Sequence, residues 1–311
     1  MDIRIKPLLY GIYSFLPFEN YLRLKSKKSG GSDNADYCYS IWLRHVKKIQ
    51  ANTSNSCYFD SLLELGPGDS HGIGYCALLC GAKKYYAVDA VASYDKFHNL
   101  KIFNQLVVFF QKQIDLDKVI THNRVKPKIS DLDFPKDIFS KSFLKKSLNP
   151  ERLDEIRRNI LNGHGDFIEI IDYKDISEKE ISVELIISQA VMEHVENPDK
   201  IYKILSKFLS RSGLMTHIID FKSHGVCKTK NGHFFISKFL WFLIRGKRDY
   251  LLNRYTPSKH KEIISQIETL DLVFEENYPY SSSDNLVSKE LTKNNSDYLI
   301  SSSHLIAKKK I

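Results

Sequence analysis

The chain has 311 residues, enough for one large domain with additions or two small ones. Hydrophobic residues make up 42% of it and charged residues 27%, a globular balance that excludes an intrinsically disordered chain. The formal net charge of +9 is typical of a Lys-rich solvated surface. It equally favours a partner with negative charge, such as nucleic acid, a phosphate-bearing glycan or an anionic membrane surface.

The five cysteines are scattered, and none of them has the spacing of a zinc site. An odd number in a chain of this length argues against a disulfide scaffold. Cys76 and Cys80 lie one helical turn apart among apolar residues, so we expect them to be buried. The pattern favours a reducing, cytoplasmic setting.

Residues 1–55 are expected to form an N-terminal helical extension. Apolar residues recur at helical spacing between Ile5 and Phe18, a segment too short to span a bilayer, which takes roughly 20 apolar residues. We expect an amphipathic helix packed on the core, with docking on a membrane surface as the alternative. A turn at 29–32 precedes a second helix with one apolar face, made by Tyr37, Ile41, Trp42, Val46 and Ile49.

Residues 56–220 alternate strand and helix signals, which is typical of a parallel sheet with helical crossovers. The five expected strands are Phe59–Leu65, Tyr85–Val88, Phe167–Ile171, Val183–Ile187 and Leu214–Ile219. A helix runs through Cys76–Cys80, and another begins at Asn197-Pro198, with Asn as its cap. The polar, Lys-rich stretch at about 91–162 is long for one crossover and is expected to be a helical insertion or lid.

Residues 221–311 begin with a basic, aromatic loop through His233 that is expected to cover the substrate pocket. The apolar stretch Phe234–Ile244 is core in the first interpretation and a lipid-facing surface in the second. A helix over Ser258–Thr269 and strands near Leu272–Glu275 and Ser301–Ala307 follow. Together the three regions predict an α/β protein with a Rossmann-like, doubly wound, mostly parallel sheet of seven strands, closed by antiparallel strands from the tail.

The end of the first expected strand reads Glu64-Leu65-Gly66-Pro67-Gly68. Two glycines allow a tight turn and a close approach of the backbone to a ligand. Asp89 lies 21 residues after Gly68, at the end of the next strand, where a carboxylate can accept both hydroxyls of a ribose. The spacing therefore predicts an adenosine-type cofactor at the carboxyl ends of these strands.

His71 separates two classes of adenosine cofactor. A dinucleotide fingerprint requires glycine at this position so that the helix can pack closely and direct its amides at a pyrophosphate. S-adenosylmethionine has no pyrophosphate, and its ammonium and sulfonium groups suit Glu64 and exposed carbonyls. The sequence thus favours S-adenosylmethionine and disfavours a dehydrogenase.

Glu64–Gly68, Asp89 and the string Ser188-Gln189-Ala190-Val191-Met192-Glu193-His194-Val195 resemble class I S-adenosylmethionine-dependent methyltransferases over residues 56–220. The resemblance implies that the first-strand loop holds the methionine part, the second-strand acid the ribose and an acid after the third strand the adenine. Two departures are Glu184 in place of aspartate and the large Tyr173 after Asp172. The implied cofactor residues are Glu64, Gly66, Pro67, Gly68, Asp89, Asp172, Ser188 and Gln189.

Further strings resemble a bacterial subgroup found among surface-polysaccharide biosynthesis proteins. They are Gly30-Gly31-Ser32 with Tyr37–Trp42, His217–Gly225, Asn231-Gly232-His233, Arg245–Arg248 and Asn253-Arg254. The resemblance implies a sugar or glycan acceptor. The basic side chains favour a phosphate-bearing or lipid-linked form of it, and the expected location is cytoplasmic, with the inner face of the membrane as the alternative. Asn231, His233 and Arg254 are the expected substrate-binding residues, with the basic side chains as a clamp for phosphate.

A hydroxyl acceptor needs a base, and histidine suits that task. The candidates at the ends of the fourth and fifth strands are, in order, His224, Asp220 and His194. His217 lies inside the fifth strand and is expected to be buried. Alternatively, His194 caps its turn and Asp220 only orients a neighbour. A metal site of His194, Asp220 and His224 lacks close ligand spacing, so no metal is expected.

Three other functions are weighed against this one. A nucleic-acid base methyltransferase is disfavoured, because Asn/Asp-Pro-Pro-aromatic is replaced by Ser188-Gln189-Ala190-Val191 and no Pro-Cys nucleophile is present. An RNA ribose or small-molecule methyltransferase remains open. So does a non-catalytic relative that only binds S-adenosylmethionine.

Overall fold

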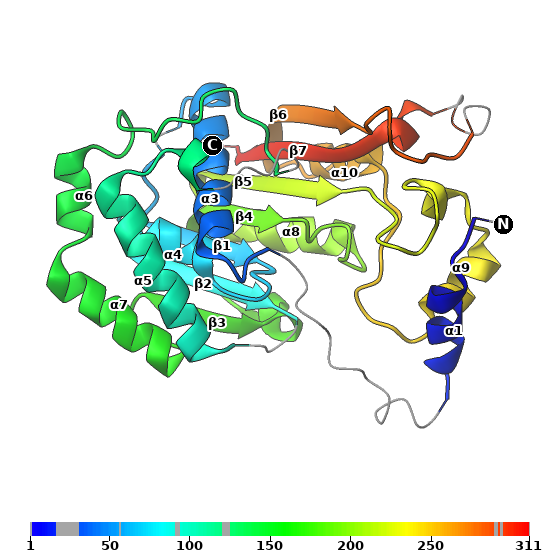
Figure 1. Ribbon diagram of the computed structural model, residues 1–311, viewed down its shortest axis with the longest axis horizontal. Coiled ribbons are helices and arrows are strands. Elements are labelled where there is room, and N and C mark those ends of the chain that lie inside the picture. Colours follow the sequence, from blue (N-terminus) through cyan, green and yellow to red (C-terminus); the bar gives the residue numbers. More distant parts are fainter. Residues whose placement is uncertain are drawn as a thin grey trace.

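The computed structural model describes residues 2–16, 31–55, 57–90, 94–119, 125–288, 292 and 295–310. At its centre is a seven-stranded sheet in the order β3-β2-β1-β4-β5-β7-β6 (Figure 1). The strands are β1 (Ser61–Leu65), β2 (Lys84–Asp89), β3 (Ile168–Asp172), β4 (Val183–Gln189), β5 (Leu209–Asp220), β6 (Leu270–Pro279) and β7 (Ile300–Lys309). Strands β1–β5 are parallel to one another. Strand β7 runs antiparallel to both β5 and β6. The predicted α/β class, strand number and closing antiparallel strands are confirmed.

Helices cover both faces of the sheet because successive strand residues point to opposite faces. Leu62 belongs to one apolar cluster and its neighbour Leu63 to the other. The first cluster is formed with α3 (Ala35–Asn52), α4 (Gly72–Leu79), α5 (Lys96–Lys112), α6 (Lys141–Ser147) and α7 (Pro150–Asn162). The second is formed with α8 (Pro198–Phe208) and α10 (Pro257–Ser265). The sheet is therefore doubly wound, as expected.

Helix α3 is the long helix expected from the apolar face of residues 37–49. Asn34 caps it by accepting a hydrogen bond from the amide of Asp36 at 2.8 Å. Trp42 is buried on the sheet side, and its Nε1 donates to the Sγ of Cys80 at 3.2 Å. Cys76 and Cys80 are both buried, as the sequence predicts.

The stretch expected as an insertion is helical and packs against the sheet. It contains α5, the 3-10 turn Leu116–Lys118, α6 and α7, and their apolar side chains join the first cluster. Helix α7 ends at Gly163, which has a φ of +77° that glycine adopts without strain. These helices extend the core on one face, so they do not form a lid.

The fifth strand begins earlier than expected, because Gly213 does not end the preceding helix. Helix α8 ends at Phe208 and β5 starts at Leu209. The register shifts between the pairs Val183↔Leu209 and Leu185↔Leu214, so the chain bulges between Leu209 and Leu214. Ser212 adopts a φ of +65° inside this bulge.

The tail contains the 3-10 turn Gly232–Phe235, α9 (Lys238–Arg245), α10, β6, a 3-10 turn at Ser296–Leu299 and β7. Helix α10 stops at Ser265, four residues before the expected end at Thr269. Strand β6 extends to Pro279, past the expected end at Glu275. These are differences of boundary, and the order of elements is as predicted.

Helix α1 (Ile5–Tyr13) does not pack on the core of the sheet, so that expectation is wrong. It packs on α9, and the two helices lie beside the sheet at one end of the molecule (Figure 1). They meet closely at Gly11, where an added Cβ would lie 2.1 Å from the carbonyl oxygen of Leu243. Phe18 and the turn residues Ser29 and Gly30 lie outside the described residues, as do 91–93 and 120–124 of the expected insertion. Among the helices that the structure describes, none is long and apolar enough to cross a membrane.

Candidate active site

A cavity of about 480 Å³ lies at the carboxyl ends of β1, β2 and β4. Parallel α/β sheets bind ligands at this edge. Six of the residues singled out from the sequence line the cavity: Gly66, Pro67, Gly68, Asp89, Gln189 and His194. Tyr37, Val191 and Tyr250, which were not among the expected cofactor, substrate or catalytic residues, also line it.

The turn after β1 depends on its two glycines. Gly66 and Gly68 have φ values of +69° and +76°, in the left-handed region that other residues rarely adopt. An added Cβ at Gly66 would also lie 2.6 Å from the Cγ2 of Val191. The amide of Gly68 donates to the Oδ2 of Asp89 at 3.2 Å, which joins the turn to the end of β2.

Residues 31–34, before α3, lie against the glycine turn. The Oγ of Ser32 accepts a hydrogen bond from the amide of Asp69 at 2.9 Å, and Gly31 and Ser32 both line the cavity. This contact was missed from the sequence. The Gly-Gly-Ser turn was visible there, but nothing in its residue types showed which element it would meet.

Helix α4 packs closely on the sheet although His71 replaces the third glycine of a dinucleotide fingerprint. Gly74 supplies the close approach, because an added Cβ there would lie 2.1 Å from the ring of Tyr85. The ring of His71 is buried beside Tyr94, with 4.8 Å between their centroids. The helix thus approaches the strands one turn later than in a dinucleotide fold.

Glu64 is buried behind the glycine turn and is not among the residues that line the cavity. Its Oε2 accepts from the hydroxyl of Tyr85 at 2.7 Å and from the amide of Gly74 at 3.1 Å. Burial raises the pKa of Glu64 to about 8, and the two hydrogen bonds oppose that shift. In this position the carboxyl ties β1 to β2 and α4; its contact with the cofactor ammonium stays a prediction.

Asp172 pairs with Asp89 in the register of β2 and β3, so both acids end neighbouring strands. The carboxylate of Asp172 is exposed and accepts from the amide of Lys174 at 2.9 Å. The next residue, Tyr173, lines the cavity, whereas Asp172 does not. The adenine contact of Asp172 stays a prediction, with Tyr173 as a second candidate at the same strand end.

Ser188 and Gln189 end β4 and face different surroundings. Ser188 is buried, and its hydroxyl lies 2.7 Å from the Nδ1 of His217. His217 is buried as expected, and burial lowers its pKa to about 3. Gln189 lines the cavity, and its Oε1 lies 3.1 Å from the Nε2 of His45, which holds the amide in place.

The turn after β4 is fixed by the loop between α9 and α10. The side-chain amide of Asn253 donates to the carbonyls of Met192 and Val195, at 2.7 and 2.9 Å. The Nδ1 of His194 lies 2.9 Å from the carbonyl oxygen of Tyr250. Asn253 was visible in the sequence only as part of a resemblance, and its role as a clamp depends on the tertiary fold.

The three expected catalytic residues meet at the ends of β4 and β5. The rings of His194 and His224 stand at 89°, with 5.1 Å between their centroids, and the Nε2 of His224 lies 3.8 Å from the Oδ2 of Asp220. Asp220 also pairs with the ammonium of Lys222 at 2.7 Å. Burial lowers the pKa of both histidines, which favours their neutral form. Of the three, only His194 is among the residues that line the large cavity.

His224 has a φ of +44°, a conformation that is uncommon for a residue with a Cβ. Ala190 and Tyr250, both on the cavity wall, also have positive φ values, of +55° and +58°. Strained backbone of this kind persists where the surrounding structure enforces it, and it is frequent at functional sites.

Glu193 belongs to this group and was missed as a candidate. Its side chain is buried, and burial raises the pKa of its carboxyl well above the ordinary value. One ligand atom from each of Glu193, His194 and His224 lies within 4.8 Å of the others. The residue stands next to His194 in the sequence, but only the structure shows that its side chain turns inward.

The expected substrate residues organise the loop after β5. The Nδ2 of Asn231 donates to the carbonyl of Tyr298 at 3.0 Å, and its Oδ1 accepts from the amide of Val287 at 2.9 Å. Arg254 donates to the carbonyl of Ile236 at 2.6 Å, and its guanidinium lies over the ring of Trp241. His233 is buried, and burial lowers its pKa to about 3. Their contact with a substrate stays a prediction.

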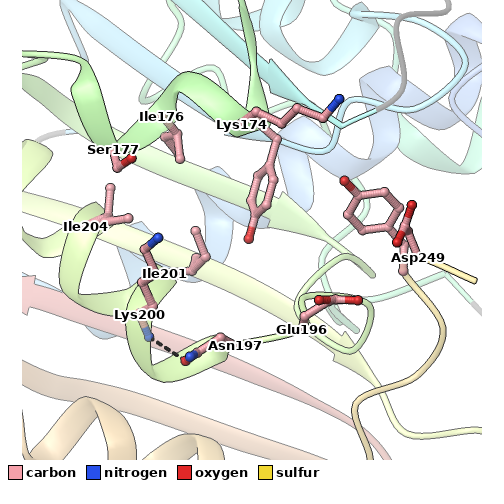
Figure 2. A pocket seen from close by; sticks show the side chains of 11 residues that line it. Lys174, Ile176, Ser177, Glu196, Asn197, Lys200, Ile201, Ile204 and Asp249 are labelled. Carbon is pink, nitrogen blue, oxygen red and sulfur yellow. Dashed lines mark hydrogen bonds between the residues drawn. The ribbon is translucent and has the colours of Figure 1, made fainter. Parts of the chain in front are cut away.

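A second cavity, of about 350 Å³, adjoins the first and shares Tyr173 and Tyr250 with it. The rings of these two tyrosines stand at 88°, with 6.3 Å between their centroids. Figure 2 shows Glu196 and Asp249 together on one side of this cavity and the apolar Ile176 and Ile204 on the other. Lys174 and Lys200 add two ammonium groups to its lining.

No family model and no curated protein matches the sequence. Among similar solved structures is the geranyl diphosphate C-methyltransferase of Streptomyces coelicolor, 11% identical, with 86% of this chain and 78% of that chain covered and a TM-score of 0.44. The plantazolicin methyltransferase BpumL is 10% identical, with 99% and 96% covered and a TM-score of 0.41. An S-adenosylmethionine-dependent methyltransferase of Mesorhizobium loti is 10% identical, with 85% and 96% covered and a TM-score of 0.41. Likeness this distant leaves the function to be inferred from the residues of the cavity itself.

Proposed function

We propose that the chain is a methyltransferase that uses S-adenosylmethionine. The observation that carries this proposal is that Gly66, Gly68 and Asp89 line one cavity at the carboxyl ends of β1 and β2. The left-handed glycine turn lets the backbone come close to the cofactor, and Asp89 stands where a carboxylate reaches a ribose. The inward Val191 fills the space above Gly66, so the turn has no room for a side chain.

Methyl transfer needs positioning above all. The acceptor oxygen attacks the methyl carbon in line with the C–S bond, the electron pair of that bond returns to sulfur, and the sulfonium becomes a neutral thioether. The acceptor hydroxyl gives its proton to a base, for which His224, Asp220 and His194 are the candidates. Holding the two reactants in line supplies roughly 7–11 kcal/mol in favourable systems.

The acceptor that we propose is a sugar hydroxyl of a glycan intermediate. The second cavity supports this assignment, because it joins the first at Tyr173 and Tyr250 and carries Glu196 and Asp249 (Figure 2). Carboxylates accept hydrogen bonds from sugar hydroxyls, and aromatic faces stack on sugar rings. Lys174 and Lys200 suit an acceptor that carries phosphate.

The surface formed by α1 and α9 supports a lipid-linked form of that acceptor. Ile5 and Phe239 are 73% and 72% exposed, and Phe242 is 57% exposed. The rings of Phe15, two residues after α1, and Phe242 of α9 lie 5.4 Å apart. We call the exposed apolar residues of these two segments, Ile5, Phe15, Phe239 and Phe242, the α1–α9 patch. An apolar face of this kind docks into the headgroup region of a bilayer.

The charges beside the α1–α9 patch favour an anionic membrane as its occupant. Lys6 is exposed on α1, and residues 238–249 contain Lys238, Lys247 and Arg248, the acidic Asp249, and Arg245, which forms an ion pair with Glu196. Basic side chains next to an inserted apolar face add attraction to anionic lipids. We place the protein at the inner face of the membrane on these grounds.

Calorimetric titration with S-adenosylmethionine tests the cofactor, and mass spectrometry of surface glycan from a deletion strain tests the acceptor. We expect micromolar-scale binding and the loss of one methyl group from the glycan. Absent binding would remove the methyltransferase proposal. Intact glycan with normal cofactor binding would remove only the acceptor and leave an RNA or other small-molecule acceptor, or cofactor binding without catalysis.

A further inference from the structure

Three side chains with metal-binding atoms meet at the ends of β4 and β5. Glu193 and His194 lie in the turn after β4, and His224 lies in the loop after the neighbouring strand. One ligand atom of each lies within 4.8 Å of those of the other two. Donors on one Zn²⁺ ion sit roughly 2.0–2.2 Å from it, which separates any two of them by up to about 4.4 Å. Small side-chain rotations therefore bring all three donors onto one ion.

The carboxylate of Glu193 most needs a partner. Glu193 is only 3% exposed, and neither carboxylate oxygen has a side-chain hydrogen-bond partner in the part of the chain that the structure describes. The nearby backbone of Glu193 and Asp220 offsets only part of the effect of burial. The neighbouring ammonium of Lys222 forms its ion pair with Asp220 instead. A buried acid without a partner is costly unless a cation or a proton compensates it. A bound metal ion would be coordinated by one or both carboxylate oxygens of Glu193.

His194 is held in the orientation of a metal ligand. A carbonyl oxygen can only accept, so the contact with Tyr250 at 2.9 Å places the proton of His194 on Nδ1. The lone pair is then on Nε2. Metal-binding histidines usually donate their second N–H to a carbonyl or carboxylate in this way. Asn253 holds the same turn and so fixes Glu193 relative to His194.

We propose that Glu193, His194 and His224 bind one divalent transition-metal ion. Two imidazoles and one carboxylate suit Zn²⁺ and its first-row neighbours better than Mg²⁺ or Ca²⁺, which prefer oxygen ligands throughout. The sequence predicts no metal here, because His194 and His224 lack close ligand spacing and lie 30 positions apart. The fold removes that objection, since β4 and β5 are adjacent and parallel and both residues follow their carboxyl ends.

The role of this ion rests on the proposed function. Three protein ligands leave at least one coordination position open, and His194 also lines the large cavity. An acceptor oxygen at the open position would be held in place, and its proton would become more acidic. With both histidines bound to the ion, Asp220 is the remaining proton acceptor among the three expected catalytic side chains.

The test uses the full chain, stripped with a chelator, dialysed and titrated with Co²⁺ by absorption and with Zn²⁺ by calorimetry. We expect one equivalent of either ion to bind, and Co²⁺ to develop visible absorption. Glu193→Gln and His224→Asn should weaken binding by at least about tenfold. Asn is chosen at position 224 because it tolerates the φ of +44° there better than other residues. Glu178→Gln and His164→Ala, at exposed residues outside both cavities, serve as matched controls and should bind like the wild type.

His224 lies in an exposed loop, so His224→Asn remains informative if Glu193→Gln fails to fold by circular dichroism. The metal site would be contradicted if the wild type did not bind Co²⁺ stoichiometrically, or if His224→Asn bound Co²⁺ with the affinity of the wild type. Glu193 would then be a protonated buried acid. The titrations contain no S-adenosylmethionine, so the two proposals fail separately. If the protein binds the ion but not S-adenosylmethionine, the methyltransferase proposal is wrong. If it binds S-adenosylmethionine but not the ion, the metal-site proposal is wrong.

Discussion

The Oδ2 of Asp89 accepts a hydrogen bond from the backbone amide of Gly68, with 3.2 Å between the two atoms. The acid at the end of β2 is thereby held at the edge of the glycine turn. Both residues line the same cavity. A ribose bound there would meet a carboxylate that is already oriented, which reduces the ordering cost of binding.

Asp89→Ala is expected to abolish measurable S-adenosylmethionine binding, because it removes both the ribose acceptor and the support of the turn. Isothermal titration calorimetry measures this. Asp172→Ala is the matched variant, an acid at the neighbouring strand end whose carboxylate is exposed and outside the cavity lining. Unchanged affinity in Asp89→Ala would contradict the site. Lost affinity in Asp172→Ala would support the adenine contact implied by the resemblance.

Gly66→Ala is expected to lose cofactor binding and to lower the free energy of unfolding by about 2–4 kcal/mol. Its cost combines a left-handed φ with overpacking against Val191. Gly163→Ala is the control, since it has a similar φ of +77° and its nearest neighbour atom would lie at 3.7 Å. That variant should lose about 1 kcal/mol and bind the cofactor normally. Urea unfolding and calorimetry report the two effects, and equal losses in both variants would exclude the role of Val191.

Acid is expected to destabilise the protein through its buried histidines, of which His260 is the cleanest example. Burial lowers the pKa of His260 from 6.5 to about 3 in the folded state. The unfolded state therefore binds more protons between these two pH values, and the free energy of unfolding falls as the pH falls through them.

The stability of the wild type relative to His260→Gln should fall by about 2 kcal/mol between neutral pH and about pH 5. Urea unfolding of both proteins at each pH measures this difference, and the contributions of groups that do not interact with His260 cancel in it. A difference independent of pH would mean that His260 has the same pKa in the folded and unfolded states, which would contradict the prediction.

The α1–α9 patch is expected to bind vesicles that contain phosphatidylserine and to bind neutral vesicles less, with affinity that falls as salt rises. Phe239→Ser combined with Phe242→Ser should weaken binding by at least about tenfold, because it removes the exposed apolar face. Phe97→Ser is the control, a side chain 70% exposed on α5. Co-sedimentation gives the affinities. If the wild type were a dimer and the double variant a monomer, the α1–α9 patch would instead bind a second copy of the chain.

The parts of the fold that repeat locally were predictable. Strand and helix alternation predicted the five parallel strands, because burial on both faces leaves apolar runs such as Leu185–Ile187. The packing of α1 was not predictable, since an amphipathic helix has the same spacing whether it meets the sheet or another helix. The earlier start of β5 depends on a bulge against β4, a tertiary pairing with no local signal.

The candidate site divides in the same way. Gly66, Gly68 and Asp89 were predicted as site residues because the residue type and spacing alone indicate a glycine turn and an acid at a strand end, and all three line the cavity. Glu193 was missed because its turn is held by Asn253, sixty positions later in the chain, a contact with no local signal. Tyr250 and Ser32, which also line the cavity, lie in loops. The spacing of residues in the sequence does not predict which elements those loops contact.

Strand β7 follows β6 in the chain but lies between β5 and β6 in the sheet. During synthesis, β6 therefore emerges with no strand to pair with, and the free edge of β5 stays open until residues 300–309 have left the ribosome. That unpaired edge is a template for association with other nascent chains. Removal of residues 300–309 is thus a route to aggregation, even though it leaves the glycine turn and Asp89 untouched.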